Sequence, residues 1–275
     1  MRLYVFTKQD AFLITIFSLI AGLLFGTYLQ GFFAKINDSQ TLQLLAMAIG
    51  EALILGPLML VMNIKKVKFH HILPLKKLNL QTWGMVFLMA IGVLALQEVI
   101  AKSTVDYFQI PEFLKGINDS VMWESPLQYI LVIFGGVIFA SITEEFLFRG
   151  VLQQSITANH QSLIPGIVVP AVVFSLFHAA YLFYIPAVIE IVLISLILGY
   201  VVAKTGNILA SILIHSINNF SGITFLGLYG DDFYIFFPES GFPWMALFGM
   251  IALAISLYYL VGRKSFIPDE ENIIE

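Results

Sequence analysis

Long apolar runs separated by short polar segments make up most of this chain. Each run approaches the ~20 residues that an α-helix needs to cross a bilayer. The eight runs are residues 11–29, 41–63, 81–101, 127–148, 163–180, 184–203, 207–229 and 242–262. The pattern predicts an all-α polytopic membrane protein with about eight transmembrane helices.

The composition supports a membrane location and excludes some kinds of chemistry. Hydrophobic residues make up 59% of the 275 residues and charged residues 12%, whereas soluble domains average roughly 45–50% and 25%. The net charge of −4 gives no reason to expect nucleic acid as a partner. The chain has no cysteine, which excludes disulfides, thiolate metal ligands and a cysteine nucleophile. We therefore expect an integral multi-pass protein in contact with membrane lipid.

The basic residues predict an orientation in the membrane. Segment 64–80 contains five lysines, whereas segment 102–126 contains four acidic residues and two lysines. By the positive-inside rule the lysine-rich segment faces the cytoplasm. With eight spans, both termini are then also expected on the cytoplasmic side.

Ionisable and amide side chains are concentrated in three of the apolar runs or at their ends. An ionisable side chain in the hydrocarbon costs about 2.5–3.5 kcal/mol. The side chains are Glu144, Glu145 and Arg149 around the end of the fourth run, His178 in the fifth, and His215 and Asn219 in the seventh. Because helix packing alone does not require so many costly groups together, the concentration predicts a functional site.

Helical spacing gives the two adjacent carboxylates different surroundings. Residues four apart share a helix face, so Glu145 is expected to pair with Arg149. Glu144 is rotated about 100° from Glu145 and is free to face His178 or His215 across the bundle. A carboxylate in low-dielectric surroundings beside an imidazole is suited to act as a general base for water.

Three further acids lie in apolar runs, namely Glu51, Glu98 and Glu190. Each could be a hydrogen-bond donor between helices, a partner of the site or part of a proton path. Helix packing is the simpler explanation for Glu51 and Glu98. Both explanations stay open for Glu190, whose run lies between the two that contain histidines.

Three motifs, taken in order, resemble those of a known protease family. They are Glu144-Glu145-x-x-x-Arg149, Phe174-x-x-x-His178 and His215-x-x-x-Asn219. This set resembles the CAAX protease and bacteriocin-processing (CPBP) family of intramembrane endopeptidases, which includes the Ras-converting CAAX endopeptidase. The resemblance implies a single transmembrane domain over residues 1–275, with N-terminal helices in 1–124 and the catalytic core in 125–225.

The resemblance also implies a role for each residue. Glu144 would activate water that His178 helps to orient, and His215 and Asn219 would stabilise the oxyanion. The supporting residues would be Glu145, Arg149 and Phe174. The expected activity is hydrolysis of a peptide bond in a membrane-associated or lipidated protein or peptide, in a bacterial or archaeal cell membrane.

Other protease chemistries have less support in the sequence. Glu144, His178 and His215 could form a zinc site with an open position, but the zincin motif H-E-x-x-H is absent. We therefore expect no metal or other cofactor, with zinc as the alternative. A G-x-S-x-G motif is also absent, and Asp231 has no second membrane aspartate with which to form a catalytic pair.

Two functions outside proteolysis are also compatible with a helical membrane protein. One is a non-proteolytic bacteriocin-immunity or scaffold protein of the same fold, which the complete motifs disfavour. The other is a transporter that uses the membrane glutamates as a proton path, for which an inverted repeat would be expected and is not found.

The predicted spans place His178 too deep to meet Glu144. Residue 144 lies near the cytoplasmic end of run 127–148, whereas His178 lies near the far end of run 163–180. The site can form only if the fourth helix continues towards Ser155, or if the fifth begins outside the bilayer and tilts.

Overall fold

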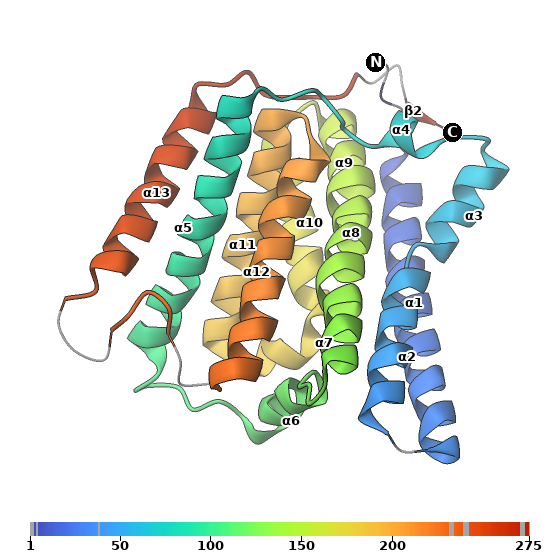
Figure 1. The fold of residues 1–275 in the computed structure, drawn as a ribbon. Coiled ribbons are helices and arrows are strands. Elements are labelled where there is room, and N and C mark those ends of the chain that lie inside the picture. Colours follow the sequence, from blue (N-terminus) through green and yellow to red (C-terminus); the bar gives the residue numbers. More distant parts are fainter. Residues whose placement is uncertain are drawn as a thin grey trace.

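The protein is a bundle of long helices that run up and down beside one another (Figure 1). The computed structural model describes residues 3, 5–37, 39–230, 234–238, 242–269 and 273–274. Asp231 lies outside these residues. The elements are β1 (Val5–Phe6), α1 (Lys8–Ile36), α2 (Gln40–Leu53), α3 (Gly56–Ile64), α4 (Phe69–Ile72), α5 (Leu80–Thr104), α6 (Glu112–Ser120), α7 (Pro126–Val132), η1 (Ile133–Phe139), α8 (Ala140–Glu145), η2 (Phe146–Leu152), α9 (Gln153–His160), α10 (Leu163–Phe177), η3 (Ala179–Phe183), α11 (Ile185–Thr205), α12 (Ile208–Tyr229), α13 (Trp244–Val261) and β2 (Ile273–Ile274).

The predicted all-α polytopic architecture is confirmed. Seven helical segments in the described part of the chain are long and apolar enough to cross a membrane. The fifth predicted span, 163–180, is too short, because helix α10 has only 15 residues. It ends at His178, whose backbone leaves the helical region with φ −86° and ψ 43°, and the 3₁₀ turn η3 follows.

The fourth span is longer than the apolar pattern predicts. Elements α7 to α9 form one continuous segment, Pro126–His160, of 35 residues. The apolar run stops at residue 148 because the next turns contain Arg149, Gln153 and Gln154, yet all three are buried. Gln154 Nε2 donates a hydrogen bond to the carbonyl of Arg149 at 2.7 Å, so this buried amide has a partner inside the protein.

This extension brings the fourth and fifth helices to a common depth. Glu145 lies 15 residues before His160, and His178 lies 15 residues after Leu163, where the chain turns back. At 1.5 Å per residue both lie about 22 Å from that turn. The fourth helix therefore continues past Ser155, which is the first of the two ways in which the site could form. Glu144 lies near the middle of this longer segment.

Two π-helical segments, η1 and η2, flank the short helix α8 that contains Glu144. Such wide turns inside α-helices are often found at functional sites. In η1, a Cβ atom built on Gly135 would lie only 3.0 Å from Ala48 Cα and 2.9 Å from Met47 Cε. Glycine therefore lets α2 pack directly against the backbone of η1.

Both chain ends lie at the same end of the bundle, beside α4 (Figure 1). Strand β1 pairs in parallel with β2, with Val5 opposite Ile273. The lysine-rich segment, residues 64–80, lies at this end too, because it contains α4. It is bound to the turn between α11 and α12, where Lys76 N–H donates to Gly206 O at 2.9 Å and Asn207 Nδ2 donates to Lys76 O at 2.8 Å. Both termini thus lie on the same side as the lysine-rich segment, as expected. That this side faces the cytoplasm stays a prediction.

Candidate active site

A buried ion pair forms the base of the candidate site. Arg149 Nη1 lies 2.8 Å from Glu145 Oε1, and both side chains are almost fully buried. The predicted pairing one helical turn apart is therefore present. Arg149 Nη2 also donates to the carbonyl and the hydroxyl oxygens of Ser195 in α11, at 3.1 and 2.9 Å. A charge buried in this way needs such partners to avoid a large desolvation cost.

The contact with α11 repeats one turn further along both helices. Gln153 Nε2 donates to Gly199 O at 2.8 Å, and each pair, Arg149 with Ser195 and Gln153 with Gly199, is 46 residues apart. A constant separation means that the two helices run parallel and in register. Sequence reasoning missed Ser195 and Gln153, although polar or small residues four apart on both helices were a detectable signal.

His215 from α12 lies between the two adjacent carboxylates. Its Nδ1 is 2.9 Å from Glu145 Oε1, and its Nε2 is 3.7 Å from Glu144 Oε2. The imidazole is buried, whereas 17% of the Glu144 side chain is exposed. Glu145 thus has Arg149 and His215 as partners, which leaves Glu144 as the more accessible carboxylate.

Phe174 packs at the centre of this group and positions His178. Its ring centroid lies 4.4 Å from that of His178 and 6.2 Å from that of His215, and Arg149 Cζ lies 5.0 Å from it. His178 Nδ1 lies 2.9 Å from the carbonyl oxygen of Phe174. Because a carbonyl only accepts, this bond places the proton on Nδ1 and leaves Nε2 of a neutral imidazole as an acceptor.

A cavity of about 280 Å³, here called the smaller cavity, connects Glu144 with His178. Its walls come from α1, α2, the Glu144 segment and the end of α10. On the α1 and α2 side, Gly22, Gly26 and Gly50 line it, and Glu51 adds a second carboxylate. The structure therefore places two of the four predicted catalytic residues around one cavity, with His215 adjoining Glu144.

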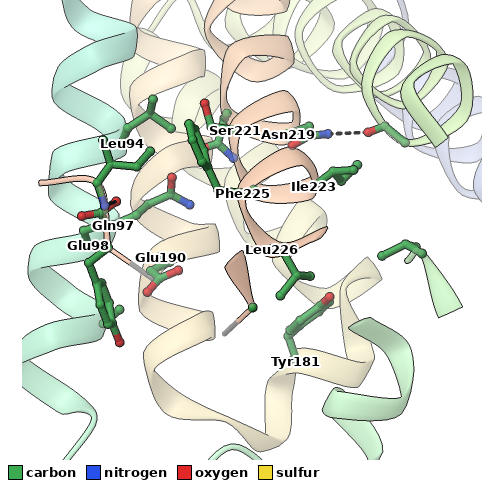
Figure 2. A pocket seen from close by; sticks show the side chains of 18 of the residues that line it. Leu94, Gln97, Glu98, Tyr181, Glu190, Asn219, Ser221, Ile223, Phe225 and Leu226 are labelled. Atoms are coloured by element: carbon green, nitrogen blue, oxygen red, sulfur yellow. Dashed lines mark hydrogen bonds between the residues drawn. The ribbon is translucent and has the colours of Figure 1, made fainter. Parts of the chain in front are cut away.

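The fourth predicted catalytic residue, Asn219, lines a different cavity of about 530 Å³, here called the larger cavity. Figure 2 shows Asn219 there together with Glu98 and Glu190. Its Nδ2 donates to the carbonyl of Gly136 in η1 at 3.0 Å. The structure therefore keeps Asn219 one turn from His215 on α12 but does not bring it into the smaller cavity.

The possible zinc ligands are not gathered into a metal site. Among the described residues, no three His, Asp or Glu side chains are arranged to hold a metal ion. Glu144 and His215 approach each other, but His178 makes no hydrogen bond or ion pair with either of them among the described residues. The geometry thus does not fit the three-residue zinc set that the sequence left as an alternative.

The fold and this cluster define a polytopic membrane protein with carboxylates and imidazoles buried together in its helical bundle. Residues 126–221 match the family model described as type II CAAX prenyl endopeptidase Rce1-like. This part of the chain is thus similar to a family of CAAX-type endopeptidases, in agreement with the three motifs. The matched region contains Glu144, His178, His215 and Asn219, and it excludes helices α1 to α6. No curated protein and no solved structure matched the chain.

Proposed function

We propose that the protein is an intramembrane endopeptidase that cleaves a membrane-associated or lipidated substrate with Glu144 as general base. The observation that carries this proposal is the shared cavity of Glu144 and His178 near the middle of the Pro126–His160 segment. Amide hydrolysis needs a positioned water, a base and a donor for the oxyanion. At this cavity Glu144 can supply the base and His178 can position the water, and His215 beside Glu144 can supply a donor.

The water would bind between Glu144 and His178. Both groups present acceptors, since Glu144 offers carboxylate oxygens and neutral His178 offers Nε2. A water that donates to both directs its oxygen lone pairs away from them, towards an incoming carbonyl carbon. Glu144 then takes a proton as the water attacks, a contribution that typically accelerates a reaction by about 10²–10⁴-fold.

The oxyanion would form beside α12. The bond to Glu145 places a proton on Nδ1 of His215, and Nε2 would serve the developing oxyanion when it also holds a proton. Asn219 has two N–H groups, of which one donates to Gly136. Its other N–H lies one turn from His215 and completes the proposed pair of donors. Arg149 balances the charge of Glu145, which keeps that carboxylate from competing for the proton of His215.

The test is cleavage of amphipathic and lipid-modified peptides by the purified protein in detergent. We expect Glu144→Gln and His178→Ala to lower kcat by at least about 10²-fold, with unchanged melting temperatures. Glu112→Gln is the matched control, because the Glu112 side chain is 87% exposed. A zinc chelator distinguishes the glutamate mechanism, which it leaves unaffected, from metal chemistry.

The second candidate function is an immunity or scaffold protein of the same fold. It would replace the protease if no peptide were cut and if cells expressing Glu144→Gln kept the phenotype of the wild-type protein. The buried carboxylates and imidazoles around one cavity favour the protease, because a scaffold has no use for groups that are costly to place in a membrane.

A further inference from the structure

The smaller cavity is lined by an acid that lies outside the three motifs and outside the matched region. Glu51 lies in α2, outside residues 126–221, and lines the cavity together with Glu144 and His178. The N-terminal helices thus supply a titratable group to the proposed reaction centre.

Helix packing does not explain Glu51. Its Oε2 atom is buried, and within the described residues it has no hydrogen-bond partner. By contrast, the Glu98 carboxylate accepts backbone N–H groups of Ile235 and Phe236 at 2.7 and 2.6 Å. A buried polar atom with no partner costs about 1–3 kcal/mol, so its retention indicates a use other than joining helices.

The position of Glu51 is fixed by close contacts of α2 on two sides. On one side Gly135 lets η1 approach Ala48, three residues before Glu51. On the other side a Cβ atom on Gly50 would lie 2.9 Å from Gly26 Cα in α1. Helix α2 also contacts α8, which contains Glu144. The backbone at Glu51 is therefore held by close helix packing and does not lie in a flexible loop.

The proposed hydrolysis needs a proton donor for the leaving amine. His178 is bonded at Nδ1 to a carbonyl, so Nε2 of the neutral ring accepts rather than donates. Lysine and arginine are absent from the described residues that line the smaller cavity. Glu51 and Glu144 line the same cavity, and two carboxylates in one site can divide the work between an ionised base and a protonated acid.

We propose that Glu51 is the catalytic acid that protonates the leaving amine, with Glu144 as the base. This inference rests on the proposed function. Ionised Glu144 takes a proton from water as the water oxygen bonds to the carbonyl carbon. The tetrahedral intermediate then collapses, the C–N bond breaks, and the nitrogen takes the proton of Glu51. Transfer of the proton from Glu144 to Glu51 restores both groups, and the two products share the remaining proton of the water.

The test compares Glu51→Gln with Glu190→Gln on two substrates, a peptide amide and the corresponding ester. Glu190 is the matched control, because it is a helix glutamate that lines the larger cavity. We expect Glu51→Gln to lower kcat for the amide by about 10²-fold or more with KM within about threefold. The ester should be cut at nearly the wild-type rate, since its leaving alcohol needs less help from an acid. Glu190→Gln should leave both rates unchanged.

The pH profile gives a readout that a merely structural role would not change. Wild-type kcat/KM for the amide should fall at low pH as the base gains a proton and at high pH as the acid loses one. Glu51→Gln should lose the fall at high pH, and Glu51→Asp should keep it.

Three outcomes would overturn the assignment of Glu51. They are amide cleavage by Glu51→Gln within threefold of wild type, equal losses for amide and ester, and a retained fall in rate at high pH. An active Glu144→Gln variant, or an inactive wild-type protein, would instead overturn the proposed function. If Glu51→Gln did not fold, the Glu51→Asp profile alone would decide, because loss of its high-pH fall contradicts the assignment.

Discussion

The larger and the smaller cavity each contain two glutamates, but the structure uses them differently. In the larger cavity, Glu98 accepts two backbone N–H groups of the 234–238 segment. In the smaller cavity, Glu51 and Glu144 have no hydrogen bond from the backbone among the described residues, and histidines lie beside Glu144. The larger cavity thus uses one of its acids to fix a connection, whereas the smaller one keeps both available for chemistry.

The comparison shows that an acid in an apolar run has no fixed meaning. Glu51, Glu98 and Glu190 look alike in the sequence, since each is a single acid in an apolar run. Their neighbours in space differ because helices distant in sequence meet at different faces. The predictions below test whether the smaller cavity is the reactive one.

The largest effect is expected from removal of the buried cation beside the smaller cavity. Arg149→Met leaves Glu145 with only His215 as an ionisable partner, at 2.9 Å. Breaking a buried pair on one side costs about 3–5 kcal/mol, so the melting temperature in detergent should fall sharply. The double variant Glu145→Leu/Arg149→Met should recover most of it. An Arg149→Met protein as stable as the wild type would contradict the buried pairing.

Asn219 tests whether the two cavities cooperate. If its free N–H serves the oxyanion, Asn219→Ala should lower kcat by about 10²–10³-fold with little change in KM. Loss of its bond to Gly136 should cost only about 0.5–1.5 kcal/mol of stability. If stability fell while activity stayed within tenfold of wild type, Asn219 would serve only to hold η1 in place.

Glu98 tests the structural use of the acid in the larger cavity. Glu98→Gln leaves one oxygen acceptor where two N–H groups are bound, so it should cost about 1.5–3 kcal/mol. Hydrogen exchange at Ile235 and Phe236 should become faster, and cleavage should stay within threefold of wild type. A large loss of activity with unchanged exchange would reverse the assignment of the two cavities.

The smallest effect is expected from a single added methyl group between α2 and η1. Gly135→Ala would place a Cβ atom 3.0 Å from Ala48 Cα, and overpacking of this kind costs about 1–3 kcal/mol. Because α2 contains Glu51, its displacement should lower kcat by a larger factor than it raises KM. Gly84→Ala is the matched control, because nothing lies within 4 Å of its added Cβ. Equal behaviour of the two variants would show that α2 has room to move.

The order of the helices and the pairing of Glu145 with Arg149 could be predicted because they depend on local periodicity. Apolar runs of spanning length form helices in a bilayer, and residues four apart meet on one face. The end of the fourth helix could not be predicted, since Gln153 and Gln154 look like loop residues. They are buried only because Gly199 and the Arg149 backbone accept their hydrogen bonds.

The sequence by itself determined the membrane architecture, the family motifs and the residues expected to carry the chemistry. Only the tertiary structure decided which of these residues meet. It places His215 between Glu144 and Glu145, sets Asn219 in a different cavity, and adds Glu51 from a helix outside the matched region. The physical reason is that spacing fixes a helix face, whereas the depth and rotation of packed helices depend on contacts such as Gly135 with Ala48.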